Sequence, residues 1–239
     1  MTEMLFRQDA YLRNAEAKVI AHTPEGGIVL DQSIFYPTSG GQPGDSGLLL
    51  WEGSSLQVVT CVKVEADSIA LMPAPSSVLP PEGALVTQEL DWDRRYKHMR
   101  VHTALHLLSV VIPLPVTGGS ISAERGRLDF NMPEAPEDKQ MLNDSLNAMI
   151  DQNFEVTESW ITDAELAARP GLVKTMSVKP PTGAGRVRLV RIGNEDNQID
   201  LQPCGGTHVV RTSEIGRVRI GKVEKKGRQN RRVYLHLDD

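Results

Sequence analysis

The chain has few of the features that mark secreted, membrane or repeat proteins. It contains only two cysteines, Cys61 and Cys204, which argues against a disulfide framework. No run approaches the roughly 18 apolar residues that span a bilayer, and the first residues carry no apolar segment after a basic start. Internal repeats and low-complexity tracts are also absent from the sequence. These absences predict a cytoplasmic protein without a membrane-spanning segment.

An excess of positive charge, which would favour binding to nucleic acid, is also missing overall. The formal net charge is −5, but it is distributed unevenly. Residues 1–90 hold 4 Lys and Arg against 11 Asp and Glu, whereas residues 91–239 hold 22 against 20. Residues 216–232 contain eight basic residues and one acidic residue. Such a stretch fits phosphate contacts, with Lys225, Lys226 and Arg228 as candidates, although a solvated strand face explains it equally well.

The first 90 residues are typical of short strands separated by turns. Alternating runs at 15–22 and 28–35 flank Pro24-Glu25-Gly26-Gly27, which is a hairpin pattern. A dense cluster of turn-forming residues follows at 36–47. Further strand-like runs lie at 48–51, 56–64, 68–72 and 84–90. This pattern predicts a small β-barrel over residues 1–90, with Cys61 as a buried thiol in its core.

The pattern changes to helical spacing near Asp91. A helix is expected over 94–112, because Val101, Leu105 and Leu108 fall on one face and Pro113 follows. A second helix is expected over 137–153. Strands are expected at 127–130, 186–192, 209–223 and 231–237. Helices packed on a largely antiparallel sheet would make residues 91–239 an α+β domain.

Two short motifs, far apart in the chain, carry candidate metal ligands. His102 and His106 are one helical turn apart, so both imidazoles can reach one ion. Cys204 and His208 enclose two glycines that would let the backbone turn and the two side chains converge. A histidine pair alone is often coincidental, but both motifs in one chain predict a tetrahedral zinc site. His98 is more simply explained as a helical residue or a support for the ligands.

At these residues the sequence resembles a known family. HTALHLL (102–108) and CGGTH (204–208) resemble the two metal-binding motifs of the alanyl-tRNA synthetase editing domain and of its free-standing relatives, the AlaX alanyl-tRNA editing proteins. The stretch SGGQPGDSG (39–47), residues 117–130 and the basic tail also follow the order of the family. The resemblance covers nearly the whole chain. It implies a barrel followed by a zinc-containing editing domain.

The resemblance also implies a reaction, a substrate and a set of site residues. The substrate would be tRNA(Ala) that carries the wrong amino acid, chiefly serine and sometimes glycine, and the reaction would be ester hydrolysis. Thr103 and Ser120 would be catalytic hydroxyls that bind the serine side chain or position water. A helix hydroxyl bonded to the preceding turn explains Thr103 equally well, and a turn residue explains Ser120. Leu105 stands where synthetase editing domains often have a hydroxyl residue. Because Leu105 is apolar, it cannot form a hydrogen bond with the serine side chain.

Several alternatives stay open at this point. Zinc could activate a water, hold the substrate or be purely structural. The chain could be a zinc-stabilised tRNA-binding module without catalysis. It could also be a fragment of a full synthetase, although it starts with Met and has no room for an aminoacylation domain. Through the synthetases, the resemblance extends to ATP and nucleotide binding and to alanine–tRNA ligase activity. In the Gly-rich stretch, a structural role is favoured for Gln42 and Asp45.

Overall fold

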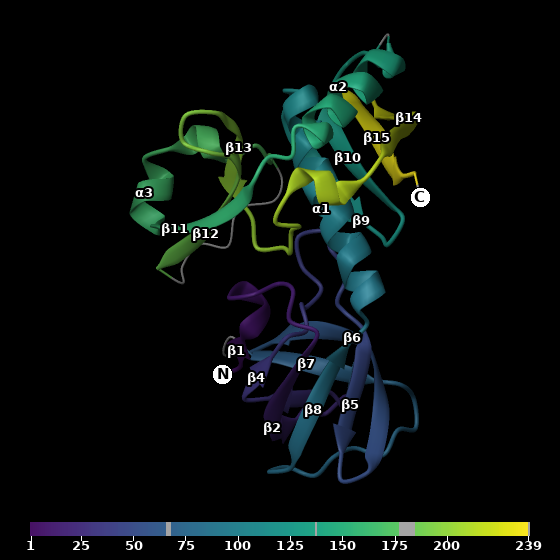
Figure 1. Ribbon diagram of the computed structural model, residues 1–239, viewed down its shortest axis with the longest axis vertical. Helices are drawn as coiled ribbons and strands as arrows, with labels where there is room; N and C mark the ends of the chain where they lie inside the picture. The colour runs from purple at the N-terminus through teal and green to yellow at the C-terminus, as the bar shows by residue number, and fades with distance from the viewer. Residues whose placement is uncertain (66–67, 137, 177–184, 239) are drawn as a thin grey trace. The chain divides into compact units, whose positions relative to one another are not determined.

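The computed structural model describes residues 1–65, 68–136, 138–176 and 185–238, which form two compact units (Figure 1). The first unit is Met1–Tyr96 and the second is Lys97–Asp239. The division falls within helix α1 (Trp92–Val111). The domain boundary near residue 91 stays a prediction.

The first unit contains a closed barrel of six antiparallel strands, joined in the order β2-β3-β7-β6-β5-β8. Closure removes the exposed edges on which other chains could pair. The barrel strands are β2 (Asn14–His22), β3 (Ile28–Leu30), β5 (Gly47–Trp51), β6 (Ser54–Val64), β7 (Ser68–Pro73) and β8 (Leu85–Leu90). The short parallel strands β1 (Glu3–Met4) and β4 (Gln32–Ser33) form a separate pair.

The barrel follows from alternation and turn chemistry. Ala17 and Val19 of β2 point into the core, and the exposed residues that alternate with them point out. The turn between β2 and β3 contains Gly26 at a φ of 82°, a conformation that glycine adopts without strain. Cys61 is fully buried in the same core, which confirms that it is a core thiol. Burial raises the pKa of the Cys61 thiol well above its ordinary value.

The Gly-rich stretch is held by a buried ion pair between Asp45 and Arg95. The Arg95 Nε donates to Asp45 Oδ1 at 3.1 Å, and its two terminal nitrogens donate to the carbonyls of Ala10 and Ile34 at 2.9 and 2.7 Å. The backbone N–H of Tyr36 donates to Asp45 Oδ2 at 2.6 Å. These contacts give Asp45 the structural role expected for it.

Over its described residues, the second unit contains two antiparallel sheets, most of α1 and two further helices, so the expected α+β class is confirmed. A four-stranded sheet has the order β14-β15-β10-β9, and a three-stranded sheet has the order β11-β12-β13. The strands are β9 (Val116–Ile121), β10 (Arg125–Asn131), β11 (Val156–Thr162), β12 (Arg186–Gly193), β13 (Gln198–Pro203), β14 (Val218–Gly227) and β15 (Asn230–Leu237). Besides α1, the helices are α2 (Lys139–Asp151) and α3 (Asp163–Ala167).

One expected strand is wrong over much of its length. The sequence pattern predicts a strand over 209–223, but β14 begins only at Val218. A 3₁₀ turn at Thr212–Ile215 precedes it, and Gly216 follows that turn with a φ of 71°. Because this positive φ turns the chain, the apolar residues on either side of it cannot belong to one strand.

Helix α1 packs on one face of the four-stranded sheet. Val101, Leu105 and Leu108 are buried, as their spacing predicts. A Cβ atom added to Gly126 of β10 would lie 2.7 Å from the Val101 side chain and 2.9 Å from that of Leu105, so glycine allows the close contact. Of the helices in the described ranges, none has the length and apolar character needed to cross a membrane.

Candidate metal centre

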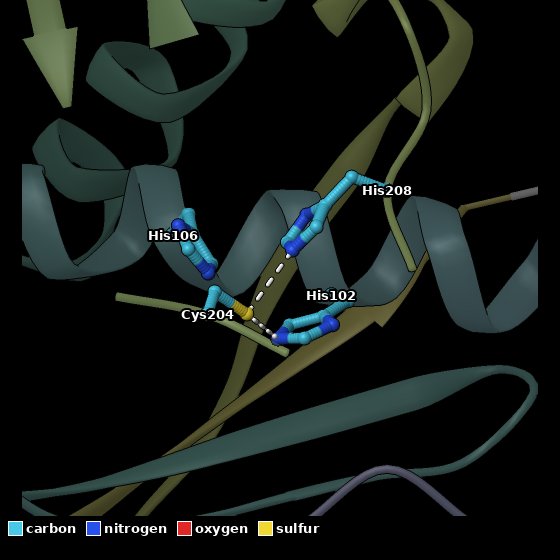
Figure 2. Close-up of side chains that lie close together, drawn as sticks. All are labelled: His102, His106, Cys204 and His208. Carbon is cyan, nitrogen blue, oxygen red and sulfur yellow. Dashed lines mark hydrogen bonds between the residues drawn. The ribbon is translucent and has the colours of Figure 1, made fainter. Parts of the chain in front are cut away.

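Helix α1 and one loop bring the four predicted ligands together (Figure 2). His102 and His106 project from successive turns of α1, and their ring centroids are 5.2 Å apart. Cys204 directly follows β13, and His208 lies four residues further along the same loop. One possible ligand atom from each of the four side chains lies within 4.8 Å of the others. The group could therefore hold a metal ion.

The loop is held in this position from both sides. Arg188 of β12 is buried, and its Nη1 donates to the carbonyls of Cys204 at 2.9 Å and Gly206 at 2.8 Å. The N–H of Cys204 in turn donates to the carbonyl of Arg188 at 3.1 Å. On the other side, the N–H of Val209 donates to Thr103 Oγ1 at 3.3 Å. These bonds fix the separation between the loop and α1.

The donor set fits zinc in type and in spacing. Cys204 Sγ lies 3.3 Å from His208 Nε2 and 3.5 Å from His102 Nε2, as the dashed lines in Figure 2 mark. In a tetrahedral zinc site with ordinary bond lengths, sulfur and nitrogen ligands lie roughly 3.6 Å apart. Thiolate and imidazole are also the ligands that zinc prefers in closed sites. The two contacts of Cys204 therefore have nearly the separation of a zinc site, and all four ligand atoms lie within 4.8 Å of one another.

The electrostatics of the site favour a thiolate and a nearby positive charge. Burial alone would raise the pKa of Cys204, but His102 and His208 beside it outweigh burial and hold this pKa well below its ordinary value. Burial and the neighbouring His102 hold the pKa of His208 well below its usual range. Burial opposes the charge of His106, yet Asp200 and Cys204 prevail and raise its pKa to about 9. The surroundings of His106 thus attract a cation.

Asp200 supports His106 from the side away from Cys204. The Nδ1 of His106 lies 2.9 Å from Asp200 Oδ2, so the ring donates its Nδ1 proton there, and loss of the Nε2 proton would leave that atom to a metal ion. Asp200 is 2% exposed and also accepts from Lys174 Nζ at 2.5 Å and Gln202 Nε2 at 2.7 Å. No motif in the sequence predicts a role at the site for Asp200, Lys174 or Gln202. The only available signal was a single acidic residue in a strand directly before the Cys204 motif.

Thr103 supports His208 in the same way. Its Oγ1 donates to the carbonyl of Met99 at 2.9 Å and lies 3.1 Å from His208 Nδ1. A hydroxyl can donate one hydrogen bond and accept two. Thr103 Oγ1 donates to Met99 and accepts from His208 Nδ1 and from the N–H of Val209, so all three positions are filled. The buried Thr103 hydroxyl therefore faces the back of the His208 ring, whereas His208 Nε2 faces Cys204.

The structure does not bring Ser120 into this group. Ser120 pairs with Arg127 across β9 and β10, and its side chain shares their sheet face with Tyr234. Gly126, which precedes Arg127 in β10, faces α1, so Arg127 faces the other way. Ser120, as the partner of Arg127, therefore lies on the sheet face away from α1. Leu105 points toward Gly126 and is a core residue.

The predicted phosphate-binding residues lie at the far end of the β14–β15 hairpin. Lys225, Lys226 and Arg228 are all exposed. Lys226 Nζ is paired with Glu224 at 3.0 Å. Arg231 and Arg232, from the same basic stretch, contact the Pro133 carbonyl and Asp129 respectively. The stretch therefore does not form one continuous patch, because alternate residues of a strand face opposite sides of the sheet.

Two family models match parts of the chain. The second additional domain of threonyl and alanyl tRNA synthetases matches residues 187–234, which include the Cys204 loop. A model of class II (A) tRNA synthetases matches residues 8–94. An alanyl-tRNA editing protein AlaX-M of Methanosarcina acetivorans is 35% identical over all of both chains. Another, of Saccharolobus solfataricus, is 34% identical over 98% of each chain.

This chain belongs to the AlaX-M family of alanyl-tRNA editing proteins. The family also shares this region with full synthetases. The alanine–tRNA ligase of Pyrobaculum arsenaticum is 34% identical over 94% of this chain, which corresponds to only 25% of the ligase. The expectation of ATP binding and ligase activity therefore has no support here, because the match leaves out three-quarters of that enzyme.

Proposed function

We propose that this chain uses zinc to hydrolyse serine, and also glycine, from wrongly charged tRNA(Ala). Membership of the AlaX-M family makes it an alanyl-tRNA editing protein and an aminoacyl-tRNA deacylase. The observation that carries the zinc proposal is the convergence of His102, His106, Cys204 and His208 from two elements far apart in the sequence. Thiolate and imidazole are ligands that zinc prefers, and the two motifs supply four of them at one point.

The proposed reaction is the hydrolysis of one ester bond. Water adds to the carbonyl of the misattached amino acid, and the bond to the ribose oxygen of the terminal adenosine breaks. The products are the free amino acid and uncharged tRNA. A zinc ion in the site supplies positive charge that polarises water or the ester carbonyl.

The residues of the chain would prepare the site for this chemistry. Three neutral imidazoles and one thiolate carry a single negative charge, so they neutralise only half the charge of a divalent cation. Asp200 and Thr103 would hold His106 and His208 with their Nε2 atoms directed inward. We therefore assign Thr103 a positioning role behind His208. Direct catalytic contact by Ser120 has no support from its position on the far sheet face.

The substrate follows from the difficulty of excluding serine and glycine at a synthetase site. A pocket built for alanine admits the smaller glycine and the nearly isosteric serine, so a second site must remove them. The test is hydrolysis of Ser-, Gly- and Ala-tRNA(Ala) by the metal-loaded protein. Rapid loss of the first two with survival of Ala-tRNA(Ala) supports the proposal. Binding of all three without hydrolysis would identify a tRNA-binding module.

We also propose that the tip of the β14–β15 hairpin contacts tRNA phosphates through Lys225, Lys226 and Arg228. Their exposure and charge support this role. Replacing all three with Ala should flatten the dependence of binding on salt by up to about one unit of slope per lost contact. Unchanged affinity and slope would leave a solvated tip. The pair between Lys226 and Glu224 makes Lys226 the weakest of the three.

A further inference from the structure

The four-stranded sheet of the second unit has one buried face and one polar face. The register places Ile220, Leu235 and Gly126 side by side on the face that packs on α1. Their neighbours along the strands point the other way. We call this second side the open sheet face. It consists of Arg125, Arg127 and Asp129 of β10, Arg232, Tyr234 and His236 of β15, Arg219 and Glu224 of β14, and Ser120 of β9.

Positive charge exceeds negative charge on the open sheet face. Asp129 is shared by Arg127 at 2.8 Å and Arg232 at 2.8 Å. Glu224 is likewise shared by Lys222 and Lys226. Each carboxylate therefore neutralises only one of its two cations.

The excess charge is concentrated at the end of the face that holds Arg125 and Arg219. These two side chains lie on either side of His236, because each is its cross-strand partner. Burial lowers the pKa of His236, and the charges of Arg219 and Arg125 lower it further. Arg219 pairs with Asp238 at 3.0 Å, but both side chains are more than half exposed, so that pair is weak. The field at His236 is thus positive.

A pocket of about 170 Å³ opens beside this end of the face. It is lined by Ser120, Ser122, Arg125, Gly126, Arg127 and Tyr234. The guanidinium groups of Arg125 and Arg127 and the hydroxyl of Ser120 are donors suited to the oxygens of a phosphate, whereas the Ser122 hydroxyl donates to the Arg125 carbonyl. The ring of Tyr234 offers a surface on which a sugar or base can pack, as aromatic residues do on other sheet faces that bind RNA.

We propose that the open sheet face binds the sugar–phosphate backbone of the tRNA, with one phosphate in the pocket between Arg125 and Arg127. This inference rests on the proposed tRNA substrate and adds a contact surface to it. An RNA backbone matches the face because it supplies a row of negative charges, and the cations here lie in rows across neighbouring strands. The pocket lies on the side of the sheet away from α1, so the bound nucleotide is distinct from the one that carries the ester.

The test is binding of uncharged tRNA(Ala) by the metal-loaded protein over a range of salt concentrations. The test variant is Arg125→Ala with Arg219→Ala, since both side chains are exposed and neither touches the metal group. The matched control is Arg169→Ala with Arg186→Ala, which removes the same charge from exposed positions outside the four-stranded sheet. We expect the test variant to bind about tenfold more weakly at low salt and to lose about two units of salt slope. The control should lose much less of either.

Two results would overturn the inference. One is equal weakening of the test and control variants, which would show that only total charge matters. The other is competition in which polyglutamate displaces bound tRNA from the wild-type protein as well as unlabelled tRNA of equal charge does. That result would show a general site for polyanions. Because uncharged tRNA has no ester, this result is independent of the proposed hydrolysis. If the wild-type protein binds tRNA through Arg125 and Arg219 but does not hydrolyse Ser-tRNA(Ala), the proposed function fails and this inference stands.

Discussion

The two units each bury a polar cluster, and the clusters differ in how their atoms are paired. In the first unit, the N–H groups of Arg95 meet Asp45 and two backbone carbonyls, so donors and acceptors match. In the second unit, Cys204 Sγ lies within hydrogen-bond distance of the Nε2 atoms of His102 and His208, and all three atoms are possible metal ligands. The first cluster is complete without a ligand. The second gathers four possible metal ligands within 4.8 Å of one another, so it could also hold a cation.

The largest effect should come from removing a ligand of the second cluster. Cys204→Ala should lower zinc affinity by more than the about 10–100-fold that loss of a supporting residue costs. Hydrolysis of Ser-tRNA(Ala) should fall with it, because the remaining histidines provide no thiolate. A chelator competition assay and a deacylation assay measure the two effects. A variant that keeps both at the wild-type level would place the metal elsewhere.

Breaking the first cluster should act on stability instead of metal binding. Arg95→Met leaves the Asp45 carboxylate buried without its partner and should cost about 3–5 kcal/mol of the free energy of unfolding. Denaturant unfolding measures this loss. Arg94→Met, one residue away, provides the control and should cost about 0.5 kcal/mol or less. If Arg95→Met removed zinc from protein that is still folded, the claim that the first cluster is purely structural would be wrong.

Asp200 tests whether the second cluster depends on the residues behind its ligands. Asp200→Asn removes the charge that holds His106 Nδ1 and should weaken zinc binding by about 10–100-fold. Asp129→Asn is the matched control, because Asp129 is also a carboxylate shared by two cations. It should leave zinc affinity unchanged. Equal losses in the two variants would point to general destabilisation.

Thr103 should give the smallest of these effects. Thr103→Val leaves His208 Nδ1 without its partner and should weaken zinc binding by about tenfold. Since the hydroxyl faces His208, hydrolysis of Ser- and Gly-tRNA(Ala) should fall by the same factor. Loss of serine hydrolysis alone would instead support direct recognition of the serine hydroxyl.

The sequence predicts features that depend on local spacing. Apolar spacing and Pro113 predict a helix over 94–112, and α1 spans Trp92–Val111. His102 and His106 share a face for the same reason. Asp200 contacts His106 across 94 positions of the chain, and spacing carries no information about such a contact. The face on which Ser120 lies depends on strand register, and one residue of shift would reverse it.

The most direct test of the central claim is the zinc content of the purified protein. Metal analysis should find one zinc per chain in the wild type and none in a Cys204→Ala, His208→Ala double variant. The Arg95→Met variant should keep one zinc per folded chain. Wild-type protein without zinc, or a double variant with a full complement of it, would contradict the account.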